Sequence, residues 1–173
     1  AMPSARAGRL CPDAVFVPPD FERYRAASAE IHGVFREVTD LVEPLSIDEA
    51  FLDVTENHLD EPLAQEVARY LKARITQVTG LTASAGAAPN KFIAKLASDF
   101  DKPDGLVVVP PERVDAFLLP LAVERIWGVG PATAKRLHEL GARTIADIRR
   151  LDPAVLEHRF GKMGRHIMAL AHG

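Results

Sequence analysis

Asp48 and Glu49 are the adjacent residues of this chain whose types and spacing best suit chemistry. They interrupt residues 45–55, a stretch whose apolar, aromatic and β-branched side chains are typical of a strand. Because neighbours in a regular strand point to opposite faces, two adjacent carboxylates can share a site only where a turn or bulge breaks the alternation. Pro44 and Ser46 indicate such a break. We therefore expect a β-hairpin with both carboxylates at its tip.

Carboxylate oxygens are hard ligands that suit Mg²⁺ with substrate phosphates close by. The pair therefore predicts a metal site for phosphate chemistry. The other interpretation is a solvated acidic pair, since polar turn tips are common. Asp53 follows on the same stretch, but at about 3.3 Å per strand residue it lies too far from Asp48 to share a metal ion. We expect Asp53 to be structural.

Three ordered segments carry a family resemblance. Residues 46–53, SIDEAFLD, resemble the palm signature of the Y-family DNA polymerases, which are lesion-bypass enzymes. Residues 84–99, SAGAAPNKFIAKLASD, with KPDG at 102–105, and residues 126–134, IWGVGPATA, match the same family in the same order. The set is most similar to the DinB branch of that family and covers nearly the whole chain.

The resemblance implies template-directed, error-prone DNA synthesis by two-metal-ion nucleotidyl transfer from deoxynucleoside triphosphates (dNTPs) to a primer 3′ end. It implies two Mg²⁺ ions, for which Mn²⁺ can substitute, with Asp48 bridging both and Glu49 holding the primer-side ion. A third carboxylate from a first palm strand has no match in this sequence. Lys102 is implied to bind the triphosphate, the alternative being a solvated loop lysine. Lys91 and Lys95 fit a solvated helix face equally well.

Gly128, Val129 and Gly130, followed by Pro131, resemble the hairpin of a helix-hairpin-helix. Backbone N–H groups of such a hairpin and of the next helix N-terminus bind a DNA phosphate without reading sequence. A Gly-x-Gly alone is weak evidence, and the flanking residues strengthen it. The residues expected at this DNA contact are Gly128, Val129, Gly130, Ala132 and Lys135.

Composition and charge limit the class of protein. The chain has 173 residues, 47% hydrophobic and 26% charged, as in ordinary globular proteins. The net charge is −3, but residues 128–173 carry eight Lys and Arg against four Asp and Glu. This basic part suits phosphate binding, although chance asymmetry would look the same. Cys11 is the single cysteine and no apolar run reaches membrane-spanning length, so we expect a cytoplasmic protein. Zinc spacings, Walker loops and dinucleotide fingerprints are missing from the sequence.

The pattern of elements predicts an α+β palm, a mixed or antiparallel sheet with helices packed on one face, and then a small all-α thumb with the helix-hairpin-helix. The domains expected are 1–16 as the end of a fingers domain, 17–109 as the palm without its first strand, and 110–173 as the thumb. Strands are expected at 14–17, 41–42, 50–55, 81–88 and 106–109. Helices are expected at 3–10, at 21–38 capped by Asp20, from a cap at Asp60 to Gly80, at 91–100 after the turn at Pro89 and Asn90, and at 112–119, 122–127 and 131–140. Thr144 with Asp147 is expected to form a capping box, Asp152 and Pro153 to start another helix, and residues 162–171 to form the last one.

Primed template DNA and dNTPs are the partners that the resemblance implies, with a sliding clamp reached through a C-terminal part beyond these residues. We interpret the sequence as part of a longer chain that is incomplete for activity. A non-catalytic DNA-binding module that keeps only the helix-hairpin-helix is the alternative. A nucleotide cyclase, which can share a palm with paired carboxylates, is disfavoured because it needs no DNA phosphate contact.

Overall fold

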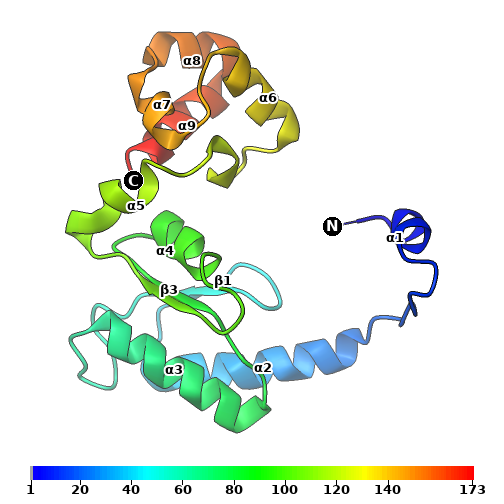
Figure 1. Cartoon of the computed structure of the whole chain (residues 1–173). Helices are drawn as coiled ribbons and strands as arrows, with labels where there is room; N and C mark the ends of the chain where they lie inside the picture. Colours follow the sequence, from blue (N-terminus) through cyan, green and yellow to red (C-terminus); the bar gives the residue numbers. More distant parts are fainter. Residues whose placement is uncertain (1) are drawn as a thin grey trace.

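The computed structural model describes residues 2–173. Helices and short strands are mixed up to Val108, and α-helices and 3₁₀ turns follow (Figure 1). In chain order the elements are α1 (Ser4–Leu10), α2 (Phe21–Val38), β1 (Val42–Pro44), β2 (Ala50–Leu52), α3 (Ala64–Thr79), β3 (Ala85–Ala87), α4 (Lys91–Ser98), β4 (Leu106–Val108), the 3₁₀ turn η1 (Pro111–Arg113), α5 (Val114–Leu118), the 3₁₀ turn η2 (Val123–Arg125), α6 (Pro131–Glu139), α7 (Ile145–Arg150), α8 (Pro153–Phe160) and α9 (Lys162–Ala171).

The strands form two small sheets. β1 and β2 pair antiparallel, with Pro44 opposite Ala50, and β3 and β4 pair parallel, with Gly86 opposite Val107. The α+β class is confirmed, but the single mixed sheet is wrong for the described residues, where the two pairs are separate sheets. Each strand is only three residues long.

Helices cover the strands from two sides, whereas one face was expected. In Figure 1 the strands lie between α2 and α3 on one side and α4 on the other. The alternation of strand side chains agrees: Leu52 and Ala83 pack against the α2–α3 core, whereas the α-carbon hydrogen of Gly86 faces the backbone of α4. Phe51, the neighbour of Leu52, accordingly lies on the α4 side.

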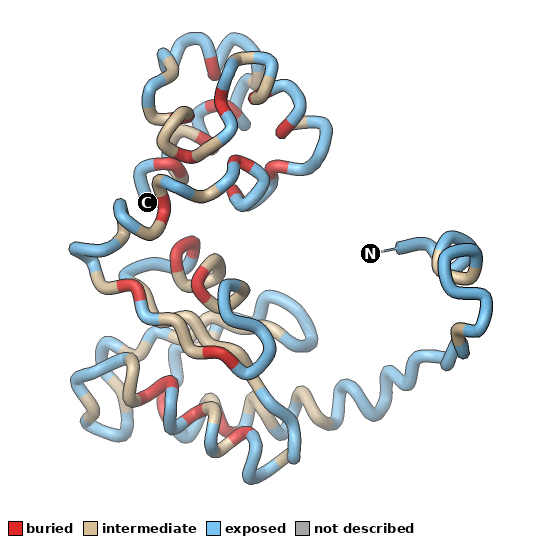
Figure 2. The backbone as a smooth tube through the Cα atoms, in the orientation of Figure 1, coloured by how far each residue is buried: buried red, intermediate tan, exposed pale blue. Residues whose placement is uncertain are grey.

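The helices and the strand predicted near the N-terminus were only partly confirmed. Asp20 caps α2 by accepting from the backbone N–H of Arg23 at 3.0 Å, as predicted. The N-terminal half of α2 runs away from the strands, so its apolar face is exposed there (Figure 2). The predicted strand at 14–17 is wrong: this segment is irregular, and Val15 and Val17 are exposed without a partner strand.

Asp60 does not cap α3. Its φ is +53°, the left-handed region, and α3 begins only after Leu63, whose side chain makes no cap hydrogen bond. The amide of Asn57 organises this loop instead, because its side-chain nitrogen donates to the backbone oxygens of Val54 and Glu61. The predicted end of this helix is confirmed, since Gly80 ends α3 with a φ of +70°.

The described residues contain two hydrophobic cores. The smaller lies between α2 and α3 and consists of Val34, Val38, Val67, Leu71 and Ile75. The larger fills the C-terminal helices and extends back into α4 through Phe92, Ile93 and Ala97. Packing therefore runs across residue 110, where the sequence suggested a domain boundary. None of the helices among residues 2–173 is both long and apolar enough to cross a membrane.

Candidate active site

Asp48 and Glu49 lie in the turn between β1 and β2, so the predicted hairpin is confirmed. The backbone oxygen of Glu49 accepts from the N–H groups of Leu45 and Ser46 at 2.8 and 3.1 Å, which closes the turn. The Ser46 hydroxyl donates to Asp48 Oδ1 at 2.7 Å. Asp48 is exposed and Glu49 half-buried, so the carboxylate pair is open to solvent on one side.

Glu49 begins a chain of ion pairs that reaches the Lys102 loop. The Nζ of Lys95, on α4, lies 2.6 Å from Glu49 Oε1 and 3.2 Å from Asp99 Oδ2. The other carboxylate oxygen of Asp99 lies 2.6 Å from the Nζ of Lys102. Two sites that the resemblance treats separately, the metal carboxylates and the triphosphate lysine, are thereby joined by four side chains of alternating charge.

For both Lys95 and Asp99, partial burial and hydrogen bonding shift the pKa in opposite directions. Burial lowers the pKa of Lys95, but the hydrogen bonds to Glu49 and then Asp99 outweigh it, so the pKa lies above its ordinary value. Burial raises the pKa of Asp99, and hydrogen bonds from Lys102 and Lys95 outweigh it and lower that pKa. Lys95 and Asp99 are therefore both charged near neutral pH.

The loop that carries Lys102 is fixed from α3. The Nζ of Lys72 donates to the backbone oxygens of Ala83 and Asp104 at 2.6 and 2.7 Å and pairs with the Asp104 carboxylate. Gly105 follows, and a Cβ there would lie 1.8 Å from the backbone oxygen of Asp101. The loop therefore requires glycine at this position.

The donor set at the turn fits a hard divalent cation in kind, because both carboxylates offer oxygens and the site has no soft ligand. Residues 2–173 contain no group of three or more His, Cys, Asp or Glu side chains placed to hold a metal ion together. The two carboxylates of Asp48 and Glu49 could therefore supply only part of a coordination shell. Asp53 points elsewhere: the N–H of Thr55 donates to its carboxylate at 3.0 Å, which lowers the pKa of Asp53.

The hairpin at residues 128–130 has N–H groups available for a ligand. Gly128 has a φ of +88°, and within residues 2–173 the N–H groups of Gly128, Gly130 and Ala132 have no backbone acceptor. The N–H of Val129 differs, since it donates to the backbone oxygen of Ile126 at 2.9 Å and Val129 is buried. Lys135, on the first turns of α6, is exposed.

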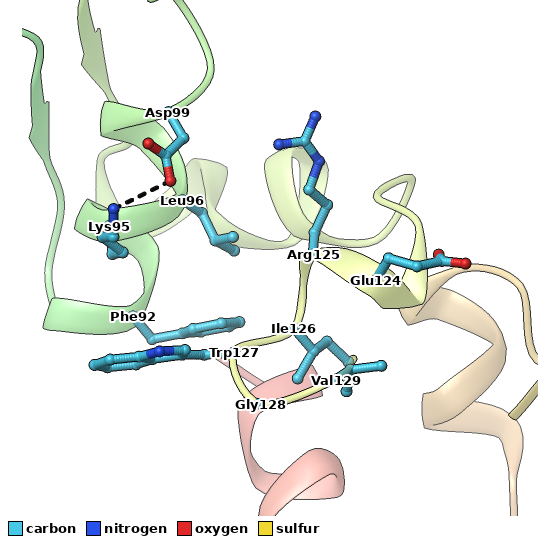
Figure 3. A pocket seen from close by; sticks show the side chains of 10 residues that line it. All are labelled: Phe92, Lys95, Leu96, Asp99, Glu124, Arg125, Ile126, Trp127, Gly128 and Val129. Carbon is cyan, nitrogen blue, oxygen red and sulfur yellow. Dashed lines mark hydrogen bonds and ion pairs between the residues drawn. The ribbon is translucent and has the colours of Figure 1, made fainter. Parts of the chain in front are cut away.

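A groove of about 250 Å³ lies between α4 and this hairpin, lined by Lys95, Asp99 and Trp127 among others (Figure 3). In Figure 3 the side chains of Phe92 and Trp127 line this groove below the Lys95–Asp99 pair. The Trp127 ring also lies 6.4 Å from the Phe51 ring, centroid to centroid. The hairpin is thus held close to the turn that bears the carboxylates.

Sequence reasoning undervalued Lys95 and missed Asp99 and Lys72. Asp99 lies four residues after Lys95, a spacing that signals an ion pair on one helix face. Lys95 contacts Glu49, which is 46 positions away, and Lys72 contacts Asp104, which is 32 positions away. No local sequence pattern predicts these contacts.

Comparison with known proteins gives two family matches and many close relatives. The sequence model of the impB/mucB/samB family matches residues 1–99. A second model, described as the fingers domain of DNA polymerase lambda, matches residues 123–160. The chain is 55% identical over all 173 residues to DNA polymerase IV of Stenotrophomonas maltophilia strain R551-3 and 54% identical to that of Neisseria meningitidis serogroup C. It spans 49% of the length of each of these curated relatives.

Solved structures give the same picture. The crystal structure of DinB from Sulfolobus solfataricus superposes with a TM-score of 0.90 at 36% identity, over 99% of this chain and 51% of that one. An insertion ternary complex of Dbh DNA polymerase superposes with a TM-score of 0.89 at 36% identity, over 99% of this chain and 50% of that one.

Proposed function

The chain belongs to the impB/mucB/samB family, and on that premise we propose that it is the palm and thumb part of a lesion-bypass DNA polymerase of the DinB type. The proposed reaction is template-directed transfer of nucleotides from dNTPs to a primer 3′ end. The observation that carries the proposal is the position of Asp48 and Glu49 in the turn between β1 and β2, within the segment that matches the family. The DNA polymerase IV relatives support the same activity.

The chain's own residues have separate tasks in this proposal. Asp48 and Glu49 would hold the divalent ions, with Mg²⁺ preferred. When bound, two such ions would favour ionisation of the primer hydroxyl and neutralise charge on the triphosphate. Lys102 would pair with triphosphate oxygens as a point charge. Lys72 would keep the loop of Lys102 in place by holding Asp104.

We also propose the domain limits and the DNA contact. Residues 1–16 would end a fingers domain, 17–109 would form the palm, and 110–173 would form a thumb with a helix-hairpin-helix. The free N–H groups of Gly128, Gly130 and Ala132 support a phosphate contact there, with Lys135 adding charge. The first half of that motif is only the short turn η2, rather than the helix expected at 122–127. A sliding clamp remains a proposed partner of a longer chain.

Primer extension by a chimera tests the activity. The 173 residues replace the matching half of the Stenotrophomonas maltophilia polymerase, and extension is measured with four dNTPs and Mg²⁺ on undamaged and abasic templates. We expect the chimera to extend the primer on both the undamaged and the abasic template. Asp48→Ala and Glu49→Ala should abolish extension but leave DNA affinity near that of the parent, because phosphate contacts elsewhere supply the affinity. Extension by either variant would refute the assignment.

A non-catalytic DNA-binding module is the second candidate. It is favoured by the lack, among residues 2–173, of a third metal-binding side chain beside Asp48 and Glu49. The 173-residue chain by itself should bind primed DNA and fail to extend it, since Mg²⁺ demands near-ideal octahedral geometry and Asp48 and Glu49 fix only part of it. A chimera that also binds DNA without extending it would favour the binding module over the polymerase.

A further inference from the structure

We propose that Lys95 is the displaceable counter-ion of the candidate metal site, and that its transfer from Glu49 to Asp99 releases Lys102 toward the triphosphate. The inference rests on the proposed function, because it assumes that Glu49 binds a divalent cation and Lys102 a triphosphate. Lys95 would be a positioning residue, since it acts through the carboxylates on either side of it.

Without a ligand, the two carboxylates and two ammonium groups of Glu49, Lys95, Asp99 and Lys102 pair with one another. The Nζ of Lys95 is shared unequally, at 2.6 Å from Glu49 and 3.2 Å from Asp99. Its side chain is only 22% exposed, whereas that of Lys102 at the far end is 53% exposed. The partly buried Lys95 can therefore pair with only two carboxylates, those of Glu49 and Asp99. Of the two lysines, Lys102 is the one that solvent and ligands can reach.

A divalent cation at Glu49 changes this balance. An ammonium group at 2.6 Å occupies the oxygen that the cation needs, and the two positive charges repel at such short range. The acceptor within reach of the displaced Nζ is the Asp99 carboxylate, which already pairs with Lys102. Closer approach of Lys95 to Asp99 weakens the hold of Asp99 on Lys102 and frees Lys102 for phosphate oxygens. By linkage, a triphosphate bound to Lys102 also favours the cation at Glu49.

Lys91 provides the matched comparison on the same helix. It lies one turn before Lys95 and carries the same charge, but it pairs with Glu43 and lies 5.9 Å from the centre of the Phe51 ring. It makes no ion pair with Glu49. Removing the charge of Lys91 changes the general field at the turn without vacating the Glu49 oxygen.

The first test is direct Mn²⁺ binding to the 173-residue chain, measured from the electron paramagnetic resonance signal of free Mn²⁺. We expect Lys95→Met to bind Mn²⁺ about two- to fivefold more tightly, the value of a partly exposed ion pair that no longer has to be broken. Lys91→Met should change the affinity distinctly less, and Lys95→Arg should restore the parent value. Circular dichroism melting checks that each variant is folded, and Lys95→Gln replaces Lys95→Met if that variant melts early.

Glu49→Gln separates failure of this inference from failure of the proposed function. If Glu49→Gln leaves Mn²⁺ affinity unchanged, the metal site itself is wrong. If Glu49→Gln weakens binding while Lys95→Met and Lys91→Met behave alike, the counter-ion role is overturned and the metal site stands.

The second test concerns the release of Lys102. Binding of dATP in the presence of EDTA should be tighter for Asp99→Asn, which no longer holds Lys102, and weaker for Lys102→Met. Equal dATP affinity of Asp99→Asn and the parent, alongside weaker binding by Lys102→Met, would refute the release step. Tighter binding by Asp99→Asn that persists when Lys102→Met is added would refute it as well.

Discussion

At the scale of single residues, Gly86 determines how closely α4 can approach β3. A Cβ at this position would lie 2.1 Å from the backbone oxygen of Ala94 and 2.6 Å from the backbone nitrogen of Ser98. Both atoms belong to the body of α4, so neither can move without shifting the helix that carries Lys95.

We expect Gly86→Ala to lower the free energy of unfolding by about 1–3 kcal/mol or more, as forced overpacking does. Urea denaturation followed by circular dichroism measures this. Gly33→Ala is the control, because a Cβ there has no atom within 4 Å and the residue lies inside α2. That variant should be more stable by about 0.5–1 kcal/mol, since alanine favours a helix. Equal effects of the two substitutions would mean that α4 does not lie on β3 as described.

The candidate site was predictable where its signal is local. Asp48 and Glu49 could be assigned to a turn, because adjacent carboxylates in an apolar strand pattern need one. The partner of Glu49 could not be found in this way. Lys95 lies on a helix whose exposed lysines look alike in sequence, and only the packing of α4 over β3 selects Lys95 rather than Lys91 for Glu49.

At the scale of elements, α7 shows how a polar signature fixes a helix start. The Thr144 side chain accepts from the N–H of Asp147, and the Asp147 carboxylate accepts from the N–H of Thr144 at 2.9 Å, so the predicted capping box is confirmed. The hydrogen bonds from Thr144 and from the N–H of Arg143 lower the pKa of Asp147. Because the folded-state pKa is depressed, the stabilisation is present above the unfolded-state pKa and is lost as the pH falls through the folded-state value.

We therefore expect Asp147→Asn to lower the melting temperature at pH 7, with the difference from the parent shrinking as the pH is lowered through the acidic range. Thermal melts across a pH series measure this. Thr144→Ala should cost about 0.5–2 kcal/mol, the usual value of a lost N-cap, at every pH where Asp147 stays ionised. A pH-independent difference between Asp147→Asn and the parent would contradict the charged capping interaction.

The hairpin before α6 carries a built-in reporter, since Trp127 is the only tryptophan of the chain and is 48% exposed. We expect duplex DNA to change its fluorescence, with an affinity that falls steeply as salt is raised. Lys135→Met should reduce the slope of log affinity against log salt by about one unit if Lys135 contacts a phosphate. Glu139→Gln, on the same helix, is the control and should not reduce that slope. DNA affinity that is indifferent to salt would count against a phosphate contact here.

Elements with caps and periodic apolar residues were predicted best. α2, α4 and α6 begin within a residue of where Asp20, Asn90 and Pro131 indicated. Short apolar runs were less informative, because a strand needs a partner and residues 14–17 have none among the described residues. Asp60 failed as a cap because Asn57 organises the loop before α3, a competition between two capping-type residues that sequence alone does not decide.

At the scale of the whole molecule, the boundary between the two hydrophobic cores does not coincide with the boundary between the α+β part and the helical part. α4 belongs by sequence to the α+β part, yet its buried face contributes Phe92 and Ile93 to the core of the C-terminal helices. Since α4 also carries Lys95, the distance from Lys95 to Glu49 depends on the packing of residues far beyond it in sequence. Mutations in the C-terminal core should therefore reach the candidate active site, whereas mutations in the α2–α3 core should affect it less.

A pair of matched substitutions tests this division. Ile167→Val, in the larger core, and Ile75→Val, in the smaller one, remove the same methylene from buried positions and should each cost about 0.5–1.5 kcal/mol. Amide hydrogen exchange resolves where the loss is felt, because local opening follows cooperative units. We expect Ile167→Val to speed exchange in α9 and α4 together and to leave α3 little changed. Ile75→Val should speed exchange in α3 and leave α4 little changed. If α4 instead follows Ile75→Val, then α4 unfolds with the α2–α3 layer, and the C-terminal helices do not determine where Lys95 lies.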